Sequence, residues 1–282
     1  MSFAESDAVY LRGGAGRSAR VQHEGAEATR SEVTKTPLQC SSSTRGPVLM
    51  SAETPSGPPI QELVEIEASL RQVLCLGVVR AEGVAVRLDA PDVWAEIDRI
   101  GSALRAHYGG KTPGEMLGLQ PARELYRRTG EDPTKFRPSS EALLRRVLRG
   151  EALYRINSLV DLCNLCALEF LLPIGLYDMD RISGPVMARL GIDEEGYESL
   201  GKGTYTVAGR LALFDMRGPF GSPTNDSKRT AITEETRHCL MVIFGPGSYS
   251  AIRMDGHAHA AIARLREFAQ PARVEKVVLG GR

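Results

Sequence analysis

The sequence predicts a mixed fold in which helices dominate the middle of the chain and strands dominate its last third. Apolar residues recur at intervals of three and four between Trp94 and Tyr108, which predicts a helix with one apolar face. After Asp180, short apolar runs alternate with glycine-containing turns, a pattern typical of strands. The 282 residues, 42% apolar and 25% charged, have the composition of a soluble globular protein with room for a sizeable core.

The chain divides into two regions at the proline cluster near residue 58. Residues 1–58 are rich in Gly, Ser, Thr, Arg and Glu and show no apolar period, so they are predicted to be disordered. Met50 opens the part that looks foldable, and a start codon assigned too early is the alternative explanation for this extension. Residues 59–282 are predicted to form one folded domain.

Net charge and cysteine usage limit the partners and the compartment. Lys plus Arg and Asp plus Glu both number 35, so no global field attracts the protein to nucleic acid or to an anionic membrane. The five cysteines lie mostly in apolar runs, which favours reduced thiols in a cytoplasmic protein over a disulfide framework. The sequence has no apolar run of about 18 residues and no signal peptide, so no membrane association is expected.

In the first part of the folded region the pattern predicts a hairpin and several helices. Residues 60–70 are ambiguous, whereas Val73–Val79 and Val84–Leu88 read as two strands joined by a Glu-Gly turn. The helix that contains Trp94 stops at Gly109-Gly110. Further helices are expected over residues 123–128, from Ser139 or Ser140 to before Gly150, and over residues 158–172.

In the second part the pattern is mainly strand. Strands are expected over residues 186–190, 204–207, 211–216 and 239–244, followed by a helix over 257–268 and a strand over 276–279. The loop 221–237 interrupts this series. It is too polar to be core and long enough to line a site.

Basic side chains gather in one stretch of this otherwise neutral chain. Between Arg123 and Arg155, nine basic residues stand against five acidic ones, a local balance of +4. A surface that contacts phosphates is one interpretation, and a solvated helix face with internal ion pairs is the other. The candidate phosphate-binding residues are Arg137, Arg145, Arg146 and Arg149.

The helix predicted over residues 158–172 carries polar groups that an apolar helix does not need. Asn157, Asp161 and Asn164 are spaced by four and three, so they lie along one face from the helix N-terminus. An unpaired buried polar group costs about 1–3 kcal/mol, and a helix N-terminus favours a developing oxyanion, so these residues are candidate catalytic groups. For Asp161 the alternative is a capping box that starts at Ser158, which leaves Asn164 unexplained.

Two further segments offer ligand-binding groups. A turn is predicted after Pro173 and Gly175, where backbone groups approach a ligand closely, and two aspartates follow it. The loop 221–237 supplies an acid, a base and hydroxyls. Turn or cap roles are the alternative for the aspartates. The candidate substrate-binding residues are Tyr177, Asp178, Asp226, Arg229 and Thr230.

Cys163 and Cys166 form a CxxC pair inside the same predicted helix. A zinc site needs a second ligand pair and none follows, so we expect two small apolar side chains packed in a buried helix, with no metal and no cofactor. The sequence has no GxSxG, phosphate-binding loop or dinucleotide fingerprint, which argues against a serine hydrolase, a nucleotide hydrolase and a dehydrogenase.

Three segments, in the same order, resemble the free-standing B3/4-domain proteins, which are relatives of the editing domain in the phenylalanyl-tRNA synthetase beta subunit. The resemblance extends from Val73 to Phe268. It implies an α+β fold, with a mainly antiparallel sheet and surrounding helices, and hydrolysis of the ester between a wrong amino acid and the terminal ribose of tRNA. The segments are YRRTGEDPTKFRPSSEALLRRVLRG, INSLVDLCNLCALEFLLPIGLYDMDRISG and NDSKRTAITEETR.

The positions that match the synthetase domain include Asn157, Asp161, Asn164 and Asp178. One position departs from it, because the histidine of the synthetase turn falls on Gly175 here. The role of that histidine in the editing pocket therefore does not carry over, and a preference for phenylalanine or tyrosine is not implied.

The resemblance makes aminoacyl-tRNA the expected partner. An aminoacyl ester is already activated, so a positioned water, groups that stabilise the oxyanion and a side-chain pocket suffice. In this hypothesis Asn157 and Asn164 orient the ester and the water. Asp161, Asp178 or Asp226 binds the ammonium or acts as general base, and the arginines hold the acceptor end. The alternatives are a tRNA- or amino-acid-binding module without catalysis, which the missing histidine favours, and an esterase or amidase for small molecules.

Overall fold

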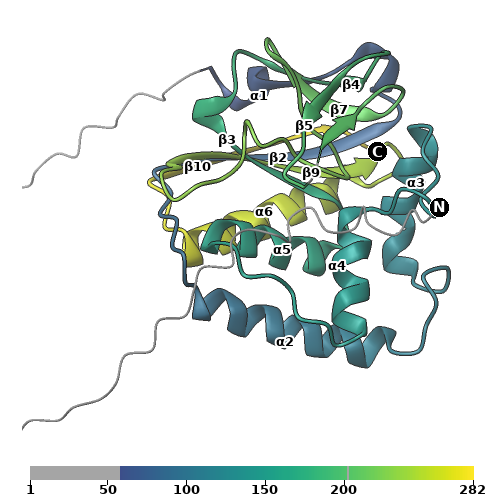
Figure 1. Ribbon diagram of the computed structural model, residues 1–282, viewed down its shortest axis with the longest axis vertical. Helices are drawn as coiled ribbons and strands as arrows, with labels where there is room; N and C mark the ends of the chain where they lie inside the picture. The colour runs from purple at the N-terminus through teal and green to yellow at the C-terminus, as the bar shows by residue number, and fades with distance from the viewer. Residues whose placement is uncertain (1–57, 202) are drawn as a thin grey trace, which may run out of the picture. The chain divides into compact units, whose positions relative to one another are not determined.

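The structure, a computed structural model, describes residues 58–201 and 203–282, which form an α+β domain (Figure 1). The extension predicted for residues 1–58 lies outside the described residues except for Pro58. The helices are α1 (Ile60–Leu63), α2 (Pro91–Tyr108), α3 (Gln120–Arg128), α4 (Ser139–Leu148), α5 (Ser158–Phe170) and α6 (Ala251–Phe268), with short 3-10 turns η1 (Ala68–Leu70), η2 (Leu117–Leu119) and η3 (Met179–Arg181).

The strands form two four-stranded sheets and a hairpin. They are β1 (Val64–Ile66), β2 (Leu74–Glu82), β3 (Ile174–Asp178), β4 (Val186–Leu190), β5 (Gly196–Glu198), β6 (Thr204–Thr206), β7 (Leu211–Asp215), β8 (Gly218–Gly221), β9 (His238–Pro246) and β10 (Arg273–Gly280). The first sheet has the order β10-β2-β9-β3 and the second the order β1-β4-β7-β8, and β5 pairs with β6. Only β1 and β4 are parallel among these described strands, so the prediction of a mainly antiparallel sheet is confirmed.

The central strands of the first sheet, β2 and β9, are buried on both faces. On β9, Cys239 and Met241 face the helices, whereas Leu240 and Val242 face the second sheet. Figure 1 shows α5 and α6 along one face of the first sheet, the second sheet over its other face, and α2 outside α5. Because both faces are covered, β2 and β9 read as nearly continuous apolar runs rather than alternating ones.

Most predicted elements are confirmed with ends shifted by a few residues, but the hairpin at residues 73–88 is wrong. Strand β2 pairs with β9 on one side and with β10 on the other. The segment 84–88 is not a strand: the backbone N–H groups of Val84 and Ala85 donate to the carbonyls of Arg237 and Ala269, both at 2.9 Å. The helix predicted over 257–268 begins already at Ala251.

Candidate functional site

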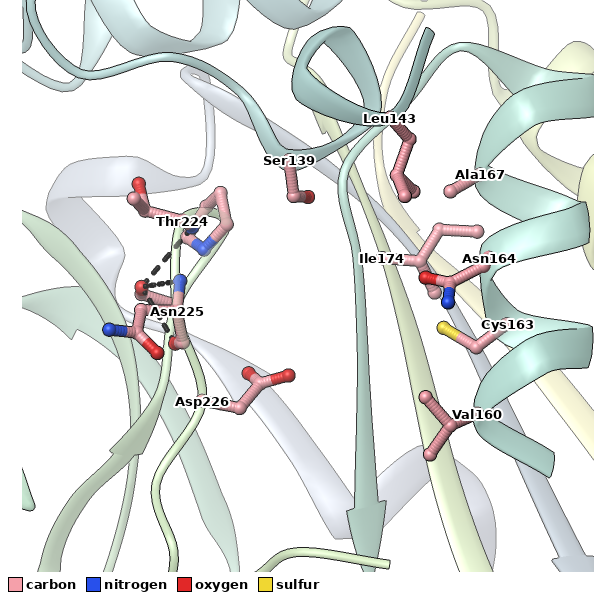
Figure 2. A pocket seen from close by; sticks show the side chains of 12 residues that line it. Ser139, Leu143, Val160, Cys163, Asn164, Ala167, Ile174, Thr224, Asn225 and Asp226 are labelled. Atoms are coloured by element: carbon pink, nitrogen blue, oxygen red, sulfur yellow. Dashed lines mark hydrogen bonds between the residues drawn. The ribbon is translucent and has the colours of Figure 1, made fainter. Parts of the chain in front are cut away.

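A pocket lies between helix α5, the first turn of α4 and the loop that follows β8 (Figure 2). Helix α5 contributes residues at intervals of three and four, which therefore share one face. The cavity measures about 40 Å³, room for about three water molecules. The lining residues are Ser139, Leu143, Val160, Cys163, Asn164, Ala167, Ile174, Ser222, Pro223, Thr224, Asn225 and Asp226. We call it the α5 pocket.

Two predicted site residues face each other across the α5 pocket. Figure 2 shows the Asn164 amide and the Asp226 carboxylate pointing into the space between helix and loop, with the Ser139 hydroxyl on a third side. The amide NH₂ can donate to a carbonyl oxygen, and the carboxylate can accept from an ammonium group. The arrangement therefore offers a hydrogen-bond donor and a carboxylate acceptor to a polar ligand.

Asn157, unlike Asn164, has a structural role at the start of α5. It is the N-cap of α5, and its side-chain oxygen accepts a hydrogen bond from the Val160 backbone N–H at 3.0 Å. The Ser158 hydroxyl accepts from the Arg87 backbone N–H at 2.9 Å, so the capping box considered as the alternative role of Asp161 does not start at Ser158, and the cap lies one residue earlier. Asn157 is buried and does not line the α5 pocket.

Asp161 is held inside the core by groups of the fold. One carboxylate oxygen accepts from the indole Nε1 of Trp94 at 2.7 Å, and the other accepts from the Ile156 backbone N–H at 3.1 Å. Burial raises the pKa of Asp161, and these two hydrogen bonds together with the Arg155 guanidinium oppose that rise. The spacing by four and three along α5 is as predicted, yet only Asn164 of the three polar residues reaches the α5 pocket.

Tyr177 and Asp178 lie on strand β3, so the turn predicted there is wrong. One oxygen of the Asp178 carboxylate caps η3 through the Asp180 N–H at 3.0 Å, and the other accepts from the Thr236 hydroxyl at 2.7 Å. Both residues are buried and neither lines the α5 pocket. The structure gives Asp178 the cap role that was its alternative.

The Tyr177 ring explains the glycine at position 175. A Cβ atom on Gly175 would lie 2.5 Å from the ring carbon Cζ of Tyr177, and one on Gly221 would lie equally close to it. The ring also packs edge-on against Phe220, with centroids 5.0 Å apart. Tyr177 is fully buried between two glycines, so no side chain fits at position 175 while the tyrosine is present.

Arg229 and Thr230 are also placed away from the α5 pocket. The Arg229 guanidinium forms two hydrogen bonds to the Asp215 carboxylate, at 2.8 and 3.0 Å. The Thr230 hydroxyl lies 3.1 Å from the Ser227 hydroxyl and is fully buried. Of the loop 221–237, only its first part, residues 222–226, forms a pocket wall.

The predicted phosphate-binding arginines cluster around α4. Glu141 is fully buried and accepts two hydrogen bonds from Arg123, at 2.7 and 3.0 Å. Arg137 and Arg145 approach the same carboxylate to 4.0 Å. Because Arg123 already pairs closely with this carboxylate, Arg145, whose side chain is 36% exposed, is only weakly neutralised by it.

The other two arginines of this set contact an acidic residue just beyond the helix. Arg146 and Arg149 lie 3.3 and 2.5 Å from the Glu151 carboxylate. The stretch therefore combines internal ion pairs with a local excess of positive charge, and Arg145 and Arg146 lie in the last turn of α4, at the opposite end of the helix from Ser139.

The cysteines do not form a reactive site. Cys75, Cys163, Cys166 and Cys239 are buried free thiols, and Cys40 lies outside the described residues. Burial raises the pKa of the Cys163 thiol well above its ordinary value, so the one cysteine in the α5 pocket stays protonated. Within the described ranges, no cluster of three or more His, Cys, Asp or Glu side chains suits a metal ion, and no helix is long and apolar enough to cross a membrane.

Sequence reasoning missed several pocket residues. The sequence pattern predicts Ser139 only as the start of a helix, and Ser222 and Thr224 only as members of a polar loop. Leu143 and Ile174 looked like ordinary core residues, and no local signal separates a pocket-lining apolar side chain from a core one.

Comparison with known proteins identifies the family. The model of the B3/4 domain matches residues 121–267. The chain is 30% identical over 145 residues to the phenylalanine–tRNA ligase beta subunit of Yersinia pestis, an alignment that covers 48% of this chain and 18% of that protein. An N-terminal fragment of the phenylalanyl-tRNA synthetase beta subunit from Pyrococcus horikoshii is similar in structure, with a TM-score of 0.37 and 12% identity over 76% of this chain and 53% of that one.

The chain therefore spans less than a fifth of that ligase subunit and about half of the solved fragment. The family match covers more than half of the 282 residues and includes helices α4 and α5, the loop after β8 and every residue that lines the α5 pocket. This chain belongs to the B3/4 domain family.

Proposed function

We propose that this protein hydrolyses the ester between a wrongly attached amino acid and the terminal ribose of tRNA, acting in trans on aminoacyl-tRNA. The observation that carries the proposal is the α5 pocket, in which an amide and a carboxylate face each other from two walls. Membership of the B3/4 family and the similarity to a tRNA ligase subunit support tRNA as the partner.

In the proposed reaction, Asp226 binds the α-ammonium group and the Asn164 amide donates a hydrogen bond to the ester carbonyl oxygen. A water molecule in the pocket adds to the carbonyl carbon. The bond from this carbon to the ribose oxygen breaks, and a proton from the water ends on that oxygen, so the products are the free amino acid and deacylated tRNA. Charge that develops on the carbonyl oxygen strengthens the bond from Asn164, which lowers the barrier.

Asp226 is the carboxylate assigned to the substrate because it is the only one of the three candidates that lines the α5 pocket. Asp161 accepts hydrogen bonds from Trp94 and Ile156, and Asp178 accepts from Thr236 and Asp180. The α-ammonium role also fits the remaining lining, since none of the described residues around the pocket is lysine, arginine or histidine.

The arginines near α4 are assigned to the acceptor end of tRNA. Arg137 and Arg145 lie around Glu141, two residues after Ser139, which lines the α5 pocket. A phosphate bound there is next to the pocket that takes the aminoacyl ester. Because the whole chain carries no net charge, binding is expected to be modest and sensitive to salt.

The test is deacylation of a panel of misacylated tRNAs. We expect wild type to exceed the buffer rate on at least one of them, and Asn164→Ala to reduce that rate by about 10²-fold, as loss of an oxyanion donor does. Asp226→Asn should raise KM for the same substrate. Asp98→Asn on the exposed face of α2 is the matched control and should behave as wild type. No turnover of any tRNA by wild type would overturn the proposal.

A binding module without catalysis is the second candidate. It is favoured by position 175, where the synthetase domain has a histidine and this chain has glycine. No histidine side chain fits there, because the Tyr177 ring fills the space. This candidate predicts that wild type binds aminoacyl-tRNA without turnover and that Asn164→Ala leaves the affinity unchanged.

A further inference from the structure

The loop 222–226, which presents Asp226 to the α5 pocket, rests on two buried tyrosine hydroxyls from distant parts of the chain. The Tyr197 hydroxyl on β5 donates to the Asn225 carbonyl at 2.5 Å and lies 3.3 Å from the Ser222 hydroxyl. The Tyr126 hydroxyl on α3 lies 2.8 Å from the Thr224 hydroxyl. Three of the five loop residues therefore contact a tyrosine hydroxyl.

The loop also closes on itself around Ser222. The Ser222 hydroxyl accepts from the backbone N–H groups of Thr224 and Asn225, at 3.2 and 3.0 Å. The Asn225 carbonyl accepts from both the N–H and the hydroxyl of Ser222, at 2.8 and 3.0 Å. Tyr197 thus binds at the point where the internal hydrogen bonds of the loop converge, so its hydroxyl fixes the loop as a unit.

Packing alone does not require these hydroxyls. Tyr126 is fully buried and Tyr197 nearly so, and a phenylalanine would fill the same space without a polar atom to satisfy. A buried hydroxyl bonded to one loop geometry favours that geometry over displaced ones, because any shift leaves the oxygen without its partner. The residue after Asn225 is Asp226, whose carbonyl is held by the Leu200 N–H at 3.1 Å.

We propose that Tyr126 and Tyr197 are positioning residues for Asp226, holding the loop 222–226 so that the carboxylate faces Asn164. The inference rests on the proposed function for its kinetic consequence. It extends the proposed function, because two residues that do not line the α5 pocket determine the position of a residue that does.

The kinetic test is a double-mutant cycle. Tyr197→Phe should lower kcat/KM for deacylation about tenfold, because a small misplacement of a binding group costs one to two orders of magnitude, and Tyr126→Phe should act in the same direction. In the Asp226→Asn background, Tyr197→Phe should cause no further loss. Tyr249→Phe is the matched control, since it also removes a buried hydroxyl with a partner, His257 at 2.8 Å, outside the pocket, and it should leave kcat/KM unchanged.

Hydrogen exchange of the loop gives a readout that does not depend on activity. Tyr197→Phe should increase exchange at the backbone amides of Ser222, Thr224, Asn225 and Asp226, and Tyr249→Phe should not. Equal kinetic losses from Tyr197→Phe with and without Asp226, or unchanged exchange in the loop, would overturn the positioning role. If wild type deacylates no tRNA, the proposed function fails, and the exchange experiment still decides whether the tyrosines hold the loop.

Discussion

The indole nitrogen Nε1 of Trp94 donates a hydrogen bond to the Asp161 carboxylate at 2.7 Å and thereby joins helix α2 to helix α5 inside the core. The second carboxylate oxygen accepts from the Ile156 N–H. In Asp161→Asn, an NH₂ group faces one of these two donors, so we expect the free energy of unfolding to fall by about 1–3 kcal/mol. Urea denaturation measures this loss.

Deacylation separates the structural role of Asp161 from a catalytic one. Per folded molecule, the activity of Asp161→Asn should stay within about twofold of wild type, because the carboxylate does not line the pocket. Asp98→Asn, exposed on the same helix as Trp94, should change neither stability nor activity. Unchanged stability with lost activity would show that Asp161 belongs to the catalytic site.

Asp161 also shows what the sequence alone predicts and what it does not. The apolar period predicts α2 and α5, and a polar residue within an apolar helix predicts a partner for it. No local pattern reveals that the partner is the indole of the other helix, because this pairing arises only when the two helices pack. The same spacing therefore predicts one site for Asn157, Asp161 and Asn164. In the structure, Asn157 caps α5 and Asp161 joins α5 to α2, so both have structural roles.

For the strands too, the sequence predicts the elements but not which elements pair. The sequence predicts the apolar runs of β2 and β9, but it also predicts a hairpin between β2 and residues 84–88, whereas β2 pairs with β9 and β10. Likewise, the loop 221–237 was recognisable as a wall from its polarity, while its facing partner on α5 and the tyrosines behind it come from segments far away in the chain.

Gly175 is expected to be intolerant of any side chain. The Tyr177 ring occupies the space that a Cβ would need, and Gly221 on the other side leaves the ring no room to move. Gly175→Ala should lower the free energy of unfolding by about 1–3 kcal/mol, the usual cost of overpacking. In the Tyr177→Leu background, where the ring is absent, Gly175→Ala should cost less stability than it does in wild type.

Gly114→Ala is the control for this substitution, because a Cβ at Gly114 meets no atom within 4 Å. Thermal denaturation of the single and double variants measures the coupling between positions 175 and 177. Full stability of Gly175→Ala would show that the Tyr177 ring adjusts freely and that crowding does not explain the glycine.

Arg145 is expected to contribute to tRNA affinity rather than to stability. Its guanidinium lies 4.0 Å from a Glu141 carboxylate that Arg123 already binds at 2.7 Å, so it retains charge for a phosphate. Arg145→Gln should weaken tRNA binding and reduce the slope of log K against log salt concentration by about 1. Arg99→Gln, 60% exposed on α2, should change neither, and equal slopes for Arg145→Gln and wild type would contradict the assignment.

Glu131 is expected to make stability depend on pH. It is buried, 3.8 Å from the Arg210 guanidinium, and burial raises its pKa to about 7 from an ordinary value of 4.5, with Arg210 opposing the rise. The folded state therefore holds the proton more tightly than the unfolded state. Its contribution to stability is complete below pH 4.5 and is lost as the pH rises through about 7.

Glu131→Gln stays neutral at every pH and should escape this loss. The difference between the two pKa values corresponds to about 3 kcal/mol, so at pH 8 the variant should be more stable than wild type by up to about that amount, while near pH 4.5 the two should agree. Urea denaturation of both proteins between pH 5 and pH 8, with the exposed Glu62→Gln as control, tests this difference. Parallel curves for wild type and Glu131→Gln would mean that the buried carboxylate remains charged throughout the range, with Arg210 fully compensating its burial.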